Sequence, residues 1–186
     1  MAADLSRELT KAKEKYEEAL RNKGIVAVKE YRRFAKLYLK WAETSLLTAS
    51  ALHDVSQSSD LKKALRLADS YDGNAWTIVA SYYSMFYVAS ALVALKDLKV
   101  VGGSSHLPTK SAFLRLYIEN KVLAVRLGLS YDETERLARA FLSERENRER
   151  AQYEIAASVI QRDAERSLEN ARSFFEKIRP LIERSG

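Results

Sequence analysis

The chain of 186 residues contains no cysteine, and this absence excludes several kinds of chemistry. Disulfides, zinc–thiolate sites, iron–sulfur clusters and a cysteine nucleophile all require the missing thiol. Histidine is scarce as well. Only His53 and His106 are present, and neither belongs to a Glu-x-x-His pair of the kind that binds iron in carboxylate bundles. We therefore expect neither a metal ion nor another cofactor.

Glycine and proline are also rare, with six and two residues respectively. The one adjacent pair, Gly102-Gly103, predicts a turn rather than a glycine-rich phosphate loop. The remaining sequence is rich in Ala, Leu, Glu, Lys and Arg, which favour helices. The sequence therefore predicts an all-α protein.

The predicted helices cover most of the chain. They run roughly over residues 4–22, from 25 or 26 toward 53, and over 61–67, 75–95, 105–120, 132–153 and 156–182. We expect residues 25–186 to form one up-and-down helical bundle domain. Residues 1–24 form an N-terminal helix extension in this interpretation, because Gly24 ends the first helix. Its narrow apolar stripe is typical of a helix that docks on one surface.

Three finer predictions concern single residues. Asn74 follows the turn at Asp72-Gly73, so we expect it to cap the next helix. Trp41 and Trp76 lie within apolar helices, which predicts that both belong to the core rather than to a surface where bases stack.

The most unusual absence is that of charge between Ala75 and Leu95, because 30% of the whole chain is charged. A helix without charge on any side is either a membrane span or the centre of a bundle. Tyr82, Tyr83 and Tyr87 lie near its middle, whereas tyrosines of membrane spans prefer the interfaces. No secretory signal pattern opens the chain. We therefore expect a cytoplasmic protein with a buried central helix and no membrane association.

The net charge of +6 leaves two interpretations open. A basic protein can bind nucleic acid or an acidic partner, or it can simply have a solvated basic surface. The polar segment from Ser143 to Tyr153 poses the same choice. It is either a solvated helix face with ion pairs one turn apart or a phosphate-binding surface.

Three motifs resemble those of the HEPN domain family of small helical proteins. The segment Tyr82-Tyr-Ser-Met-Phe86 resembles the Tyr-Tyr-Ala-Met-Phe core helix of one HEPN subfamily. Ser105-His106 resembles its Thr-His element, and Arg148-Glu-Arg-Ala-Gln-Tyr153 resembles its Arg-x-x-Ala-Asp-Tyr element. The resemblance covers roughly residues 34–182, with insertions between residues 51 and 72.

The resemblance implies a homodimeric, toxin-like component of a toxin–antitoxin or defence system, with a minimal nucleotidyltransferase as partner. Many HEPN members are ribonucleases whose Arg and His act together. Here Arg148 matches the Arg, but Tyr153 stands where the His is expected. Because tyrosine titrates near 10, Tyr153 is a poor general base at neutral pH. The expected function is therefore nucleotide or RNA binding, without the usual Arg–His ribonuclease site.

The candidate site residues follow from these motifs. Arg145, Asn147, Arg148, Arg150 and Tyr153 are the expected nucleotide- or RNA-binding residues. On a regular helix Arg148 and Tyr153 differ in direction by roughly 140°, so they share a cleft only if both line a groove.

The candidate catalytic residues are Arg148, Tyr153 and His106. His106 is either an acid–base residue or a capping or core histidine. The alternative function is a non-catalytic helical module that binds another protein, which the narrow stripe of the first helix favours.

Overall fold

The computed structural model describes residues 5–102, 106–153 and 161–185. Its elements are, in chain order, α1 (Leu5–Arg21), β1 (Ile25–Ala27), the 3₁₀ turn η1 (Tyr31–Phe34), α2 (Ala35–Gln57), α3 (Ser59–Ala64), α4 (Asn74–Ala94), β2 (Leu98–Val100), α5 (His106–Phe113), the π-helical turn η2 (Leu114–Glu119), α6 (Val122–Leu127), α7 (Tyr131–Tyr153) and α8 (Gln161–Ser185). The predicted all-α class is confirmed.

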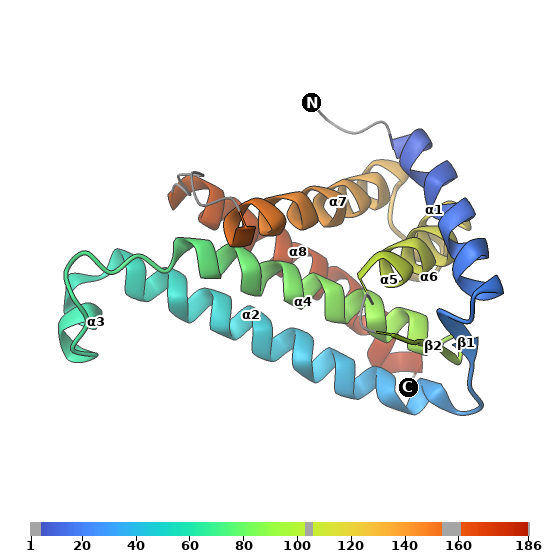
Figure 1. Cartoon of the computed structure of the whole chain (residues 1–186), viewed down its shortest axis with the longest axis horizontal. Helices are drawn as coiled ribbons and strands as arrows, with labels where there is room; N and C mark the ends of the chain where they lie inside the picture. The colour runs from blue at the N-terminus through green and yellow to red at the C-terminus, as the bar shows by residue number, and fades with distance from the viewer. Residues whose placement is uncertain (1–4, 103–105, 154–160, 186) are drawn as a thin grey trace.

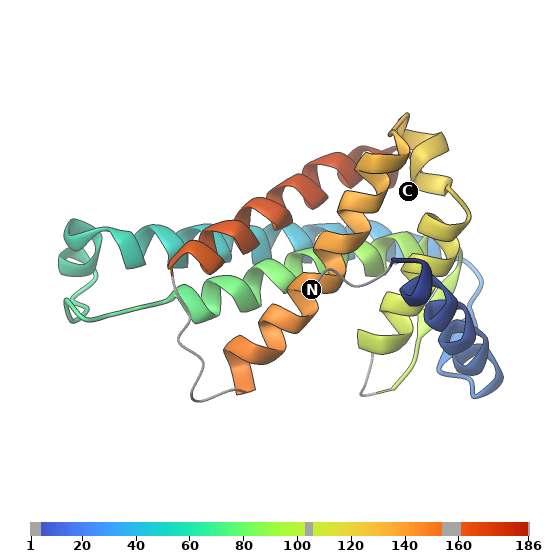
Figure 2. The ribbon, with the colours of Figure 1, turned by 90° about the horizontal axis from the view of Figure 1, so that it is seen from above.

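The long helices α2, α4, α7 and α8 form the bundle, and their chain directions alternate (Figure 1). Helices α2 and α4 lie side by side along the long axis, and α7 crosses them obliquely in the view from above (Figure 2). At one end, α1 and the paired strands β1 and β2 flank α5, while α3 lies at the opposite end of α2 (Figure 1). The up-and-down bundle is therefore confirmed as well.

Helix α4 is the central element, as its lack of charge predicts. It packs against α2, α5, α7 and α8. Among the described residues, α4 alone is long and apolar enough to cross a membrane, but 78% of its most apolar window is buried inside the protein. The neighbouring helices thus cover the apolar surface of α4, which is consistent with a soluble protein.

The start of α4 differs from the prediction. Asn74 is the first helical residue rather than the cap, and its backbone N–H donates to Asp72 Oδ1 at 2.8 Å. The N–H of Gly73 donates to Ser56 Oγ on α2, also at 2.8 Å. Two side chains that precede the helix therefore satisfy its first backbone donors.

The segment after Gly24 is a strand, not the beginning of the second helix. Ile25, Val26 and Ala27 pair antiparallel with Val100, Lys99 and Leu98 of β2. Ile25 is buried against Val93 of α4. The β-branched residues favour this pairing, and α2 begins only at Ala35, beyond the 3₁₀ turn.

Helix α1 packs against α5 and η2 of its own chain. Leu5 and Ala12 of its apolar stripe are buried, and Lys110 Nζ of α5 lies 3.2 Å from Glu8 Oε2. The narrow stripe therefore docks on the bundle itself. The division into an extension and a domain stays a prediction.

Helix α7 begins with a capping box, which the sequence interpretation missed. Ser130 Oγ accepts the N–H of Glu133 at 3.2 Å, and Glu133 Oε2 accepts the N–H of Ser130 at 3.0 Å. Glu133 Oε1 also lies 2.9 Å from Lys177 Nζ on α8. This carboxylate thus both starts α7 and ties it to α8.

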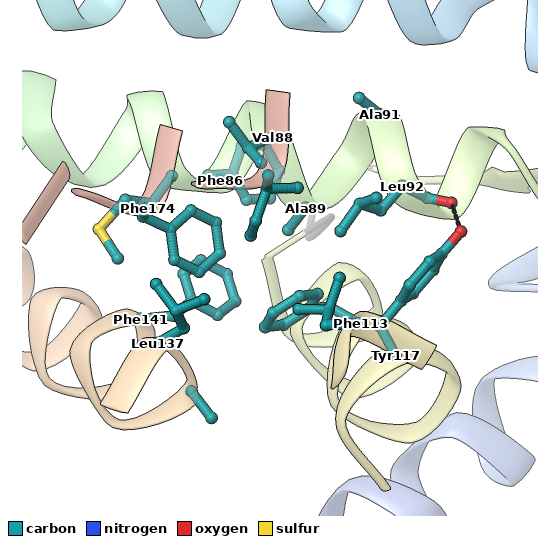
Figure 3. Close-up of a cluster of buried hydrophobic side chains, with 14 of the residues drawn as sticks. Phe86, Val88, Ala89, Ala91, Leu92, Phe113, Tyr117, Leu137, Phe141 and Phe174 are labelled. Atoms are coloured by element: carbon teal, nitrogen blue, oxygen red, sulfur yellow. Dashed lines mark hydrogen bonds between the residues drawn. The ribbon is translucent and has the colours of Figure 1, made fainter. Parts of the chain in front are cut away.

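The two tryptophans are not in the core, so this prediction was wrong. Trp41 is 43% exposed and Trp76 is 59% exposed. The buried centre consists of smaller aromatic and aliphatic side chains around α4, α5, α7 and α8, including Phe113, Phe141 and Phe174 (Figure 3). An apolar stretch predicts a helix, but it does not reveal which face a neighbouring helix covers.

Candidate functional site

Tyr82, in the middle of α4, is the centre of a buried polar cluster. Its side chain is 1% exposed, and its hydroxyl lies 2.9 Å from Nδ1 of His106, the first residue of α5. Either atom can donate, depending on the tautomer of the imidazole. The packing of α5 against α4 thus gives His106 a fixed partner within the bundle.

Arg148 reaches the same position from α7. The Cζ of its guanidinium lies 5.5 Å from the ring centroid of Tyr82 and 5.9 Å from that of Tyr83. A guanidinium over two aromatic rings has a cation–π geometry, which retains a positive charge in largely apolar surroundings. Arg148 is only 8% exposed. Three helices therefore contribute to one cluster, which we call the Tyr82 cluster: Tyr82, Tyr83, His106 and Arg148.

Aromatic rings surround His106. The centroid of its imidazole lies 4.6 Å from that of Phe86, 5.6 Å from that of Tyr82 and 5.8 Å from that of Tyr83. Burial lowers the pKa of His106 below its ordinary value, and the positive charges of Arg148 and Arg145 lower this pKa further. His106 is therefore neutral at pH 7, with one ring nitrogen that donates and one that accepts.

The hydroxyl of Tyr82 stays protonated. Burial raises the pKa of Tyr82 to about 12, although the nearby Arg148 and Arg145 act in the opposite direction. At neutral pH the cluster thus offers a hydroxyl, a neutral imidazole and a guanidinium.

The structure separates the predicted binding residues of α7. Arg145 is half-buried, affects the pKa of both Tyr82 and His106, and its guanidinium lies 3.1 Å from Glu149 Oε1. Arg145 and Arg148 therefore share a face, as their spacing predicts. Arg150 is exposed, and the side chain of Tyr153 lies outside the described residues.

Asn147 faces another part of the protein. Its Nδ2 lies 3.5 Å from Oε1 of Glu144, which also accepts a hydrogen bond from Asn170 of α8 at 2.9 Å. Glu144 is fully buried, and burial raises its pKa. The structure thus does not bring Asn147 to the Tyr82 cluster but places it in a contact between α7 and α8.

A cavity of about 250 Å³ adjoins the Tyr82 cluster, and Tyr83, Phe86 and His106 belong to its wall. Tyr31, Tyr38 and Tyr87 line it as well, with Ser90 and short aliphatic side chains. The hydroxyls of Tyr31 and Tyr38 lie 2.9 Å apart. We call this space the tyrosine cavity. It joins segments that are distant in sequence, namely η1, α2, α4, β2 and α5.

The sequence interpretation missed the roles of Tyr82 and Tyr83, which served only as markers of the fold. A signal was present, because tyrosines in the middle of an uncharged helix bring hydroxyls into the core. Such hydroxyls require partners when they are buried.

The described residues contain no group of three or more histidine, aspartate and glutamate side chains placed to hold a metal ion. Comparison with known proteins identifies no relative, since no family model, no curated protein and no solved structure matches this chain. The fold and the site therefore define an all-α bundle with a buried cationic and aromatic cluster.

Proposed function

We propose that this protein binds a nucleotide, free or as part of an RNA, at the Tyr82 cluster. The observation that carries the proposal is the convergence of Arg148 from α7 and His106 from α5 on Tyr82 of α4. The sequence predicts both residues as candidates, but at positions 42 residues apart.

The chemistry of the cluster suits a phosphorylated aromatic ligand. Guanidinium groups match the charge and shape of phosphate, and Arg145 adds a second, more accessible one beside Arg148. Tyrosine rings stack with bases of any sequence, and arginine adds a cation–π contribution. The neutral imidazole of His106 supplies a hydrogen-bond donor and an acceptor to the same ligand.

The wider role rests on the HEPN resemblance. In this proposal the protein is a cytoplasmic homodimer, the toxin-like component of a toxin–antitoxin or defence system, and a minimal nucleotidyltransferase is its partner. The Tyr-Tyr-x-Met-Phe and Arg-x-x-Ala-x-Tyr motifs support this role.

The test measures binding of a fluorescent RNA across a salt series. Arg148→Gln is expected to weaken binding and to reduce the salt slope by about one unit, because one phosphate contact is lost. Arg139→Gln is the matched control, since Arg139 lies on the same helix and pairs with Glu135. Equal affinity and equal slope for Arg148→Gln and wild type would refute the proposal.

The same samples test two other functions. Cleavage of the labelled RNA by wild type, abolished in His106→Ala, would indicate a ribonuclease that uses His106 as its acid–base residue. If neither RNA nor mononucleotides bind, the alternative of a non-catalytic protein-binding module is favoured. The stripe on α1 no longer supports that alternative, because it packs against the chain itself.

A further inference from the structure

We infer that the tyrosine cavity is a subsite for a single nucleobase, whose attached phosphate lies toward Arg145 and Arg148. This inference rests on the proposed function but goes further, because it names the part of the ligand that confers selectivity. The cavity and the Tyr82 cluster share Tyr83 and His106. A ligand in the cavity therefore contacts the same side chains that Arg148 and Tyr82 contact.

The size of the cavity limits the ligand to one ring system. Its volume of about 250 Å³ is below the range of roughly 300–1,000 Å³ that holds drug-sized ligands. A base fits this space, whereas a dinucleotide or a peptide has to remain largely outside it. The sugar and phosphate then extend past His106, which belongs both to the cavity wall and to the Tyr82 cluster.

The lining of the cavity indicates a flat, uncharged ligand. Five tyrosine and phenylalanine rings belong to the wall besides the imidazole of His106: Tyr31, Tyr38, Tyr83, Phe86 and Tyr87. No Asp, Glu, Lys or Arg is among the described residues that line it. An anionic group therefore finds no counter-charge inside the cavity and finds one only at Arg145 and Arg148.

Polar atoms on the wall match the edge of a base rather than an aliphatic chain. The hydroxyls of Tyr31 and Tyr38 form one hydrogen bond with each other, which leaves one hydrogen and further lone pairs for a ligand. Burial raises the pKa of Tyr38, so its hydroxyl stays protonated. A neutral aromatic ring with a hydrogen-bonding edge and an attached anion is the chemistry of a nucleotide.

Ser90 allows the cavity to be filled without substituting any residue of the Tyr82 cluster. It lies on the α4 wall, and its hydroxyl donates to the carbonyl of Phe86 one turn earlier. Ser90→Leu fills the space from this side, and Val100→Trp fills it from β2 on another wall. Thr48→Leu on α2 is the matched control, because the Thr48 hydroxyl makes the same contact with Thr44 and lies outside the cavity lining.

The experiment measures the binding of adenosine monophosphate and of ribose 5-phosphate, which lacks the base, by calorimetry. Wild type and Thr48→Leu are expected to prefer the nucleotide by about tenfold or more, a typical effect of base stacking. Ser90→Leu and Val100→Trp are expected to bind both probes alike, at the affinity of ribose 5-phosphate. Thermal melts show that each variant is folded.

The outcomes separate this inference from the proposed function. The proposal of a base subsite is wrong if folded Ser90→Leu and Val100→Trp still prefer the nucleotide over ribose 5-phosphate. It is also wrong if wild type binds both probes alike. Loss of both probes in Arg148→Gln still supports the proposed function in those cases. If wild type binds neither these probes nor RNA, both proposals fail.

Competition by a short RNA then identifies the source of the base. A hexamer that outcompetes the mononucleotide in wild type but not in Ser90→Leu indicates an RNA end as the natural ligand. The reverse order of affinity in wild type indicates a free nucleotide.

Discussion

Two aromatic clusters are in contact in the centre of this protein, and they differ in whether their side chains need hydrogen-bonding partners. In the first, the rings of Phe113, Phe141 and Phe174 lie with their centroids 5.3–5.6 Å apart (Figure 3). The second is the Tyr82 cluster. The two are in contact, because the rings of Tyr82 and Phe141 stack nearly parallel at 6.3 Å.

The difference lies in the polar atoms. The phenylalanine cluster contains none, so close packing of complementary shapes is enough to stabilise it. The Tyr82 cluster buries a hydroxyl, an imidazole and a guanidinium, and burial of such groups is costly unless each has a partner. A core that contains this arrangement beside an apolar one points to function rather than stability, because functional sites are where local rules of stability are broken.

The largest loss of stability is expected from a substitution in the phenylalanine cluster. Phe141→Ala removes a ring that is 2% exposed and is expected to lower the free energy of unfolding by about 3–5 kcal/mol. Urea denaturation followed by circular dichroism measures the change. Phe34→Ala, at a half-buried ring in η1, is the control and should cost less. A loss below about 1 kcal/mol for Phe141→Ala would contradict the assignment of this cluster as the source of stability.

A smaller effect is expected on the polar side. Tyr82→Phe keeps the stacked ring but removes the hydroxyl that pairs with His106 Nδ1, and we expect a loss of about 1 kcal/mol. Tyr83→Phe is the matched control, because its ring contacts the same arginine from a half-buried position. The same denaturation experiment applies. If Tyr82→Phe were as destabilising as Phe141→Ala, the two clusters would not differ as described.

Much of the fold was predictable because it follows from local patterns. The uncharged stretch predicts α4 to within a residue or two, since burial on all sides leaves a direct trace in the composition. The strand at Ile25–Ala27 was not predictable in this way, because its partner at Leu98–Val100 lies far along the chain. The exposure of Trp41 and Trp76 likewise depends on which helices cover α2 and α4.

The candidate site was predictable residue by residue but not as an arrangement. Motifs single out Arg148 and His106 separately, and the spacing of Arg145 and Arg148 correctly predicts a shared face. Their meeting at Tyr82 depends on the packing of α5 and α7 against α4, which no local pattern encodes. The same packing turns Asn147 toward Glu144 and away from the cluster.

The smallest expected effect concerns the electrostatics of the Tyr82 cluster, measured as the pKa of His106. Because burial and two arginines lower the pKa of His106, its titration midpoint is expected below the ordinary value of about 6.5. The folded state then binds fewer protons than the unfolded state near this pH. His106 therefore lowers stability as the pH falls through about 6.5.

Nuclear magnetic resonance of the imidazole signals measures this midpoint, and His53→Gln identifies which of the two histidine signals belongs to His106. Arg148→Gln removes the positive charge that lowers this pKa more than Arg145 does. It is expected to raise the midpoint toward 6.5, by a fraction of a unit up to about one unit. Arg139→Gln changes the net charge of α7 equally but removes a side chain paired with Glu135, so it should leave the midpoint unchanged. A wild-type midpoint at or above 6.5, or equal shifts in the two arginine variants, would show that Arg148 does not act on His106 within this cluster.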